Sequence, residues 1–287
     1  MTQLRERFID ELRLSGRGDS TIANYVSAVA GAATYHKRSP VTFSKDDVRA
    51  YLLHLSVERK LHPATINLHH AALGTFFKLM VPQSSIMDGI PKMKEPKRIP
   101  IVLSRDEVER LLDAIRNPKY KTATMLIYGG GLRLSECLRL KPHHIESSRM
   151  LIRVENGKGN KDRYTILSRR ALDSLRAYYL MTRPEHWLFP GRGNNHLSKR
   201  MLEKAITDGV KRAGIKREAT AHTLRHSFAT HLVEAGVALP LIQRLLGHAS
   251  IKTTTIYTHV TKIMWEQLVS PIDMPHIVPD SRGANNG

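Results

Sequence analysis

A proline-rich basic segment, residues 91–100, does most to limit how this chain can fold. It holds three prolines and four lysines or arginines in ten residues, PKMKEPKRIP. Proline lacks a backbone donor and disrupts the preceding helical turn, so this segment can neither continue a helix nor bury an apolar face. The whole chain has 287 residues, more than one compact core usually holds. We therefore predict two domains, residues 1–90 and 101–270, separated by the basic linker 91–100 and followed by a flexible tail, 271–287.

The charge balance favours a polyanionic partner. Lys and Arg number 45 against 26 Asp and Glu, which gives a formal net charge of +19, while 41% of the residues are hydrophobic. The apolar share is enough for packed cores. The cationic excess favours binding to nucleic acid phosphates, with an anionic membrane surface as the lesser alternative.

Two further features indicate where such a protein works. No run of about 18 apolar residues is present to span a bilayer, and the N-terminus lacks a signal peptide's apolar core. The single cysteine, Cys137, excludes an intrachain disulfide and a cysteine-cluster zinc site. We expect a cytoplasmic, nucleoid-associated protein without a structural metal.

Hydrophobic periodicity predicts a mainly helical chain. Apolar stripes with helix-start signals at Ser20, Ser44 and Pro63 fill the first domain with short amphipathic helices. The second domain opens with a capping box at Ser104 and Glu107. From 150 to 167 the pattern changes to period two around a glycine-rich turn, which predicts a β-hairpin. Further helices are expected at 171–179, 198–213, 223–235, 240–246 and 250–268.

Arg133 is the first of several candidates for phosphate or proton chemistry. It follows Gly129, Gly130 and Gly131, where the backbone must bend, and Glu136 stands three residues further on in a new helical pattern. A guanidinium there can face a phosphate while the carboxylate orients it. Taken alone, the motif fits a surface arginine–glutamate pair better.

Two more candidates lie in turns. Lys158 occupies the tip of the predicted hairpin between two glycines, where an ammonium can protonate a leaving oxygen; alone, a solvated turn lysine is the simpler interpretation. The GKGNK string is not a phosphate-binding P-loop, because its spacing and the following Ser or Thr are missing. His248 follows Gly247, which ends a helix, so the imidazole can reach a substrate or only cap that helix.

His222 and Arg225 are three residues apart, so an imidazole and a guanidinium share one helical face. A zinc site at His222 and His226 lacks the glutamate of a metalloprotease helix and an acidic third ligand. Tyr257 carries no signal alone, since a hydrogen-bonded core tyrosine is usual. Together, two arginines, two histidines, a lysine and a tyrosine, without paired carboxylates for a divalent metal, can break a phosphodiester.

Four stretches carry a family resemblance. GLRLSE, GKGNKDR, HTLRHSFATHL and LLGHASIKTTTIYTHV, in this order and spacing, closely resemble the tyrosine recombinase family, or lambda-type integrases, especially Xer-like members and the core of integron integrases. The first ninety residues resemble that family's helical, SAM-like core-binding domain. The resemblance implies a mainly α fold with a small β-hairpin or sheet, and a catalytic domain that forms a C-shaped clamp on DNA together with the core-binding domain.

The resemblance also implies site residues. Glu136 is a supporting residue, Tyr257 is the nucleophile, and no metal or other cofactor is implied. The implied catalytic set is Arg133, Lys158, His222, Arg225, His248 and Tyr257. We further expect DNA contacts from the hairpin and the linker, at Lys161, Arg163, Lys92, Lys94, Lys97 and Arg98. Lys161 is the nearby rival of Lys158 for the role of hairpin lysine.

The implied reaction is site-specific cleavage and rejoining of duplex DNA through a 3′-phosphotyrosyl intermediate, without metal or ATP. The implied substrate is an inverted-repeat core site, bound by a homotetramer or by a heterotetramer with a second recombinase. Three alternatives stay open: a type IB topoisomerase, a DNA-binding protein without catalysis, and a metal-dependent nuclease. The biological role is open between chromosome or plasmid dimer resolution and integration of a mobile element.

Overall fold

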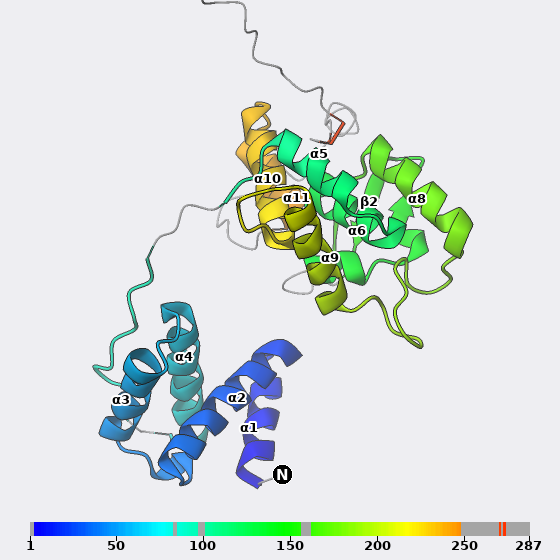
Figure 1. The fold of residues 1–287 in the computed structure, drawn as a ribbon. Coiled ribbons are helices and arrows are strands. Elements are labelled where there is room, and N and C mark those ends of the chain that lie inside the picture. The colour runs from blue at the N-terminus through cyan, green and yellow to red at the C-terminus, as the bar shows by residue number, and fades with distance from the viewer. Residues whose placement is uncertain are drawn as a thin grey trace, which may run out of the picture. The chain divides into compact units, whose positions relative to one another are not determined.

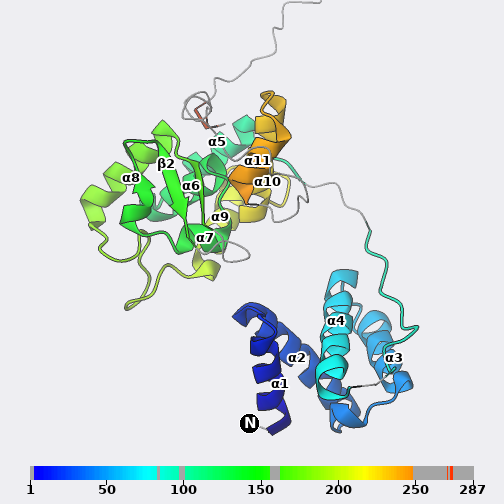
Figure 2. The same cartoon turned by 180° about the vertical axis from the view of Figure 1, so that it is seen from behind.

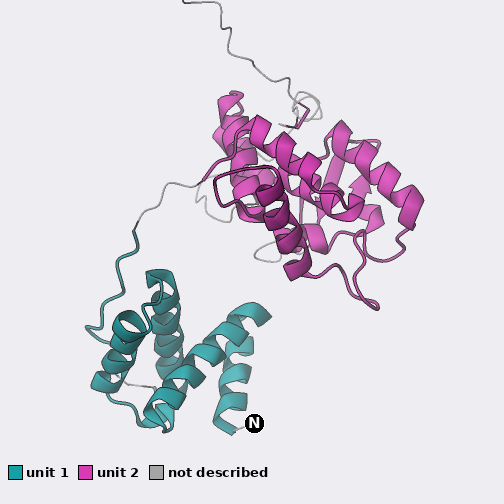
Figure 3. Cartoon of the chain, in the orientation of Figure 1, with its two compact units in different colours: residues 1–98 teal, residues 99–287 magenta. Residues whose placement is uncertain are grey.

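The chain folds into two compact units. The computed structural model describes residues 3–82, 85–96, 101–155, 162–247, 270 and 272–273. Unit 1 spans residues 1–98 and unit 2 residues 99–287, and each has its own apolar core (Figure 3). Within the described ranges, none of the helices is long and apolar enough to cross a membrane. Most described residues are helical, and a three-stranded sheet lies in unit 2, so the predicted fold class is confirmed.

In the described part of unit 1, four α-helices pack around aromatic residues (Figures 1 and 2). The rings of Phe8 and Phe76 meet edge to face in this core, with 5.1 Å between their centroids. A 3-10 turn and a π-helical turn flank the third helix. The elements are α1, Gln3–Leu14; α2, Asp19–His36; the 3-10 turn, Pro40–Thr42; α3, Lys45–Leu53; the π-helical turn, His54–Glu58; and α4, Pro63–Met80.

Local signals explain how these helices begin. Ser44 Oγ accepts the backbone N–H of Asp47 at 3.2 Å, and the Asp47 carboxylate accepts the N–H of Ser44 at 2.6 Å, so the predicted capping box opens α3. Pro63 occupies the first turn of α4, where its missing N–H costs nothing. In contrast, α2 begins at Asp19, one residue before the expected start at Ser20, and no side chain caps it.

The described part of the basic linker is bonded to unit 1. Asn67, on α4, donates to the carbonyl of Met93 at 3.0 Å and accepts the N–H of Met93 at 2.9 Å. Lys92 and Lys94 on either side of Met93 are exposed, whereas Lys97 and Arg98 lie outside the described residues. The first half of the linker is thus held against α4 by Asn67.

Unit 2 is built around α6 (Figures 1 and 2). This helix is buried from Thr122 to Gly129 and packs against α8 and α10, and α11 in turn packs against α10. The elements are α5, Arg105–Ala114; α6, Pro118–Gly129; α7, Leu134–Leu138; a 3-10 turn, Pro142–His144; β1, Ile145–Glu146; β2, Leu151–Val154; β3, Arg163–Ile166; α8, Arg169–Thr182; α9, Lys199–Arg212; α10, Ala221–Glu234; and α11, Leu239–Leu246.

The sheet is antiparallel in the order β1-β2-β3. Ile152 on β2 pairs with Ile145 on β1 and Thr165 on β3, so β2 and β3 form the predicted hairpin. Its turn, 156–161, lies outside the described residues. The two-residue strand β1 was not predicted, because two residues are too few to establish a period.

The sheet and α6 position the backbone before Arg133. Thr165 Oγ1, on β3, donates to the carbonyl of Gly130 at 2.7 Å, which ties the end of α6 to the hairpin. Gly131 then takes a positive φ of 61°, and a Cβ there would lie 2.5 Å from the ring of Phe228 on α10. Only glycine fits this bend without displacing a core aromatic residue.

Residues 272 and 273 pack against unit 2, although the sequence assigned them to a flexible tail. Ile272 is buried, and the carboxylate of Asp273 accepts the N–H of Arg169 at the start of α8 at 2.9 Å. Ile272 thus anchors this short segment in the core, and Asp273 caps the start of α8. The rest of the tail, and the helix expected at 250–268, lie outside the described residues.

Replacing Gly131 by alanine is expected to destabilise unit 2 more than the same change at Gly214. Both glycines have positive φ, but nothing lies within 4 Å of a Cβ at Gly214. Gly214→Ala should cost about 1 kcal/mol of unfolding free energy for the left-handed backbone. Gly131→Ala should cost about 1–3 kcal/mol more, because the methyl group overpacks against Phe228.

Urea denaturation followed by tryptophan fluorescence measures this difference, since both tryptophans, Trp187 and Trp265, belong to unit 2. Equal losses of unfolding free energy in the two variants would contradict the close approach of Gly131 to Phe228.

Candidate active site

Arg133 stands between the glycine bend and α7. Its backbone N–H donates to Glu136 Oε2 at 2.7 Å, and its Nη1 donates to Oε1 at 2.6 Å. Its Nη2 reaches across to the carbonyl of Gly247 at 3.1 Å. A quarter of the side chain, 25%, remains exposed. The guanidinium is therefore held in one orientation and still has surface to offer an anion.

Glu136 is the centre of a cluster of three arginines. Its side chain is only 6% exposed and accepts hydrogen bonds from Arg133 and, through both oxygens at 2.8 Å, from Arg163. Arg225 Nη1 lies 3.6 Å from Oε2. Burial alone raises the pKa of Glu136, but the bonds and charge of Arg163, then those of Arg133, outweigh it and lower the pKa to about 2.

Arg225 comes from α10 and is almost fully buried. Its Nη1 donates to the carbonyl of Gly131 at 2.7 Å, and its Nη2 donates to the carbonyl of Leu246. Burial, and next the charge of Arg133, lower the pKa of Arg225 to about 10. The group still carries its charge at neutral pH, in a place where little water screens it.

Two buried polar contacts hold α10 in place beneath this cluster. Ser227 Oγ accepts the N–H of Leu103 at 2.9 Å, and the hydroxyl of Tyr128, on α6, bonds to His231 Nδ1 at 2.8 Å. Arg225 is thus carried by a helix that is fixed on both sides.

The charges of the cluster suit an anion. Three guanidiniums face one carboxylate, which leaves two positive charges in excess. Preorganised donors of this kind stabilise negative charge that develops on a phosphate, because they need no rearrangement when it appears. The sequence predicted Arg133, Glu136 and Arg225 as site residues, and the structure brings all three together.

His222 lies on the exposed start of α10, one helical turn before His226. The two Nε2 atoms are 2.9 Å apart, close enough to share one proton in a hydrogen bond. Burial, and then the charges of His222 and Arg225, lower the pKa of His226. His222 therefore has a neutral hydrogen-bonding partner.

Arg163 lies inside the cluster, whereas the sequence suggested a DNA contact. Its side chain is 9% exposed, and besides both oxygens of Glu136 it binds the carbonyl of Leu245 through Nε at 2.9 Å. The sequence alone does not show whether an arginine at the base of a hairpin faces solvent or a buried carboxylate. Contact of Arg163 with DNA stays a prediction that these bonds do not favour.

Several expected residues fall outside the described part of the chain. Lys158, Lys161, His248 and Tyr257 are among them. Their immediate neighbours are described: Val154 and Arg163 pair across the hairpin below its turn, and Gly247 ends α11 with a φ of 61° before His248. The helix end predicted at Gly247 is therefore confirmed.

Sequence reasoning missed the backbone acceptors of the arginines. The carbonyls of Leu245, Leu246 and Gly247, at the end of α11, accept from Arg163, Arg225 and Arg133 in turn. The last carbonyls of a helix have no partner within the helix, and they carry its negative dipole end. Gly247, which marks the end of α11 in the sequence, could have indicated that unpaired backbone carbonyls lie there.

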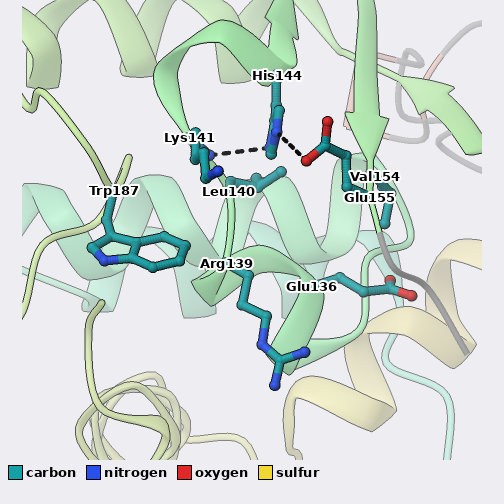
Figure 4. A pocket seen from close by; sticks show the side chains of 8 residues that line it. All are labelled: Glu136, Arg139, Leu140, Lys141, His144, Val154, Glu155 and Trp187. Atoms are coloured by element: carbon teal, nitrogen blue, oxygen red, sulfur yellow. Dashed lines mark hydrogen bonds and ion pairs between the residues drawn. The ribbon is translucent and has the colours of Figure 1, made fainter. Parts of the chain in front are cut away.

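A pocket of about 130 Å³ is lined on one side by Glu136 (Figure 4). His144 and Glu155 point toward each other in it, and Lys141 lies between them and Trp187. The Lys141 ammonium is 5.9 Å from the centre of a Trp187 ring. The residues that line this pocket are Glu136, Arg139, Leu140, Lys141, His144, Val154, Glu155 and Trp187.

One group of possible metal ligands occurs among the described residues, His143, His144 and Glu155. His144 Nδ1 accepts the N–H of Lys141 at 3.2 Å, so the proton of a neutral ring lies on Nε2, which faces Glu155 at 3.2 Å. Burial lowers the pKa of His144 and favours that neutral ring. A protonated Nε2 has no lone pair for a metal, so this group fits a close histidine–carboxylate pair better than a metal site.

Glu136→Gln is expected to flatten the acid dependence of stability. The folded pKa of about 2 lies below the 4.5 of a free glutamate, so the carboxylate contributes stability that is present above about pH 5 and lost toward pH 2. The variant should be destabilised at pH 7 by on the order of 3 kcal/mol. Urea unfolding between pH 3 and 7 checks this, and parallel curves for the two proteins would contradict the paired carboxylate.

Two family sequence patterns match the chain. The pattern described as Phage integrase family matches residues 102–263, and the one described as Phage integrase, N-terminal SAM-like domain, matches residues 4–85. The first match lies within unit 2 and includes the arginine cluster. The second lies within unit 1 and covers its helices.

Known proteins match over nearly the same extent. The putative integrase/recombinase y4qK of Sinorhizobium fredii is 37% identical over 262 residues, which cover 91% of this chain and 85% of the relative. Tyrosine recombinase XerD of Oceanobacillus iheyensis is 33% identical over 280 residues, covering 90% and 93% of the two chains. The solved XerH site-specific recombinase, in a pre-cleavage complex with difH substrate, is 26% identical, with a TM-score of 0.65 and coverage of 88% and 79%. This chain belongs to the phage integrase family.

Proposed function

We propose that this chain is a site-specific recombinase that cuts and rejoins duplex DNA through a phosphate bond to Tyr257. The observation that carries the proposal is the pair Arg133 and Arg225, fixed around a buried carboxylate with an excess of positive charge. Such a site is built for a phosphate group that gains charge during reaction. The net charge of +19 supports DNA as the partner.

The chemistry follows from the attack of one oxygen on phosphorus. The phenolic oxygen of Tyr257 forms a bond to phosphorus, and the bond from phosphorus to the 5′ oxygen breaks. Arg133, Arg225 and His248 meet the added charge of the pentacoordinate state. Attack by a 5′ hydroxyl from a partner duplex reverses the step and joins the strands. Since the phosphotyrosyl bond keeps the energy of the original diester, no ATP is needed.

Two proton transfers complete the step. A free phenol has a pKa of about 10, so Tyr257 needs a base at neutral pH. We assign that role to His222, whose partner His226 can share the proton across 2.9 Å. Lys158 protonates the departing 5′ oxygen, as its place between two glycines suggests.

The recombinase is favoured over the alternatives by the relatives. Those that match over most of the chain are named tyrosine recombinase or integrase/recombinase, and the XerH structure is a complex with a difH substrate. A binding protein without catalysis has no need for two arginines fixed around one buried carboxylate. A metal-dependent nuclease needs a carboxylate set for its metal, whereas Glu136 is occupied by arginines.

We assign the chain an inverted-repeat core site bound by four protomers, either four copies or two with a second recombinase. Exchange between two duplexes requires four cuts, one for each active tyrosine. Lys92 and Lys94, which are exposed, together with Lys97, Arg98 and Lys161, are proposed to contact its phosphates. With DNA as substrate, the protein acts in the cytoplasm at the nucleoid.

A covalent adduct is the expected result when the protein meets a cleavable site. Half-site or nicked duplexes from the DNA flanking its own gene are incubated with the protein in EDTA, then denatured and resolved by size. The wild type should give a protein–DNA species, and Tyr257→Phe should give none while still binding DNA. Arg225→Gln should slow adduct formation by on the order of 10²–10³-fold, because one charged donor is lost.

Tyr179→Phe is the matched control, since Tyr179 is an exposed tyrosine of α8 that touches none of the cluster. An adduct in Tyr257→Phe would mean that another residue is the nucleophile. Silencing by EDTA would indicate a metal-dependent nuclease. Relaxation of any supercoiled plasmid without site preference would indicate a topoisomerase.

A further inference from the structure

Arg163 uses all three of its nitrogens inside the protein. Nη1 and Nη2 each donate to one oxygen of Glu136 at 2.8 Å, in a parallel pair of bonds, and Nε donates to the carbonyl of Leu245 at 2.9 Å. The side chain is 9% exposed. A guanidinium that binds a phosphate does so with the same paired N–H edge that Arg163 gives to Glu136.

The side chain also lies against the backbone where α11 ends. A Cβ at Gly247 would lie 2.8 Å from Cδ of Arg163 and 3.0 Å from its Nε. Arg163 therefore touches β3, on which it stands, Glu136 of α7 and the last turn of α11. No side chain at position 247 could be added without moving it.

These contacts determine where two other arginines point. Glu136 orients Arg133 through two bonds and lies 3.6 Å from Arg225. The end of α11 provides Arg133 with the carbonyl of Gly247 and Arg225 with that of Leu246. Loss of Arg163 would leave the Glu136 carboxylate free to turn and would release the carbonyl of Leu245.

We infer that Arg163 is a positioning residue for DNA cleavage, which holds Glu136 and the end of α11 so that Arg133 and Arg225 face the scissile phosphate. It acts through those groups and does not bind DNA itself. The inference rests on the proposed function, because the rate that Arg163 controls is that of DNA cleavage.

The test separates the rate of cleavage from the affinity for DNA. Arg163→Met and Arg163→Lys are compared with the wild type in single-turnover cleavage at saturating protein, using the half-site duplex that gives an adduct. Arg163→Met should lose on the order of 10²-fold in the rate constant, as expected for misplaced catalytic groups. Its Kd for the same duplex, and the slope of log Kd against log salt, should stay unchanged. Arg163→Lys, which can bond one carboxylate oxygen only, should lie between the two.

Arg170→Met is the matched control. Arg170 binds both oxygens of Glu109 at 2.6 and 2.7 Å and also donates to the carbonyl of Ile272 at 2.8 Å, so it has the same kinds of acceptor as Arg163, although its side chain is 47% exposed. It lies in the same unit and does not touch Glu136. Arg170→Met should melt at a similar or slightly lower temperature than the wild type and cleave at the wild-type rate.

A pH profile adds a measurement that a merely structural role would not change. Arg163 is the main group that lowers the pKa of Glu136, so in Arg163→Met that pKa should rise. The acid-side loss of cleavage should then begin at a higher pH than in the wild type. The groups that face Glu136 are Arg133, Arg163 and Arg225, and the charged or titratable groups that line the same pocket as Glu136 are Arg139, Lys141, His144 and Glu155.

Four results would overturn the inference. If Arg163→Met cleaves at the wild-type rate but binds DNA more weakly, with a salt slope reduced by about 1, the residue is a phosphate contact. If Arg163→Met and Arg170→Met lose rate and melting temperature alike, its role is structural only. A Lys variant no better than Met, with an unshifted pH profile, would also exclude positioning through Glu136. If the wild type itself forms no adduct, the proposed function fails and the inference with it.

Discussion

A single buried carboxylate allows three guanidiniums to lie together in unit 2. Arg133, Arg163 and Arg225 carry like charges within a few ångströms, and burying any of them without a partner would be costly. Glu136 offers two oxygens to Arg133 and Arg163 and lies near Arg225. The hydrogen bonds and charges of Arg163 and Arg133 hold the pKa of this carboxyl low, so it stays charged. The orientation of α7, β3 and α10 around one point depends on this ion pairing.

Backbone carbonyls accept the hydrogen bonds of the three arginines that one carboxylate cannot accept. Gly131 provides an acceptor to Arg225, and the end of α11 provides one to each arginine. Carbonyl groups carry no net charge, so they fix the arginines without cancelling the positive potential that a phosphate needs. The site therefore combines firm anchoring of its cations with an excess of two charges. A second carboxylate would have anchored them equally well and reduced that excess.

Much of this arrangement could be predicted from the sequence. The glycine bend located Arg133, the three-residue spacing after it located Glu136, helical spacing located Arg225, and period-two alternation located the hairpin. The bonding of Arg163 could not be predicted, because a one-dimensional pattern does not show that the start of β3 meets Glu136 of α7. The packing of Ile272 and Asp273 was missed for a related reason: composition suggests flexibility, whereas one apolar side chain and one cap suffice to anchor a short segment.

The three carbonyls at the end of α11 belong to consecutive residues, Leu245, Leu246 and Gly247. A helix turns by about 100° for each residue, so successive carbonyl oxygens lie at different positions around the axis of one short stretch of backbone. Unwinding or rotating that last turn would remove a bond from each arginine in the same event. Assembly of the arginine cluster should accordingly be cooperative, with the last turn of α11 behaving as one element that has an ordered and a disrupted state.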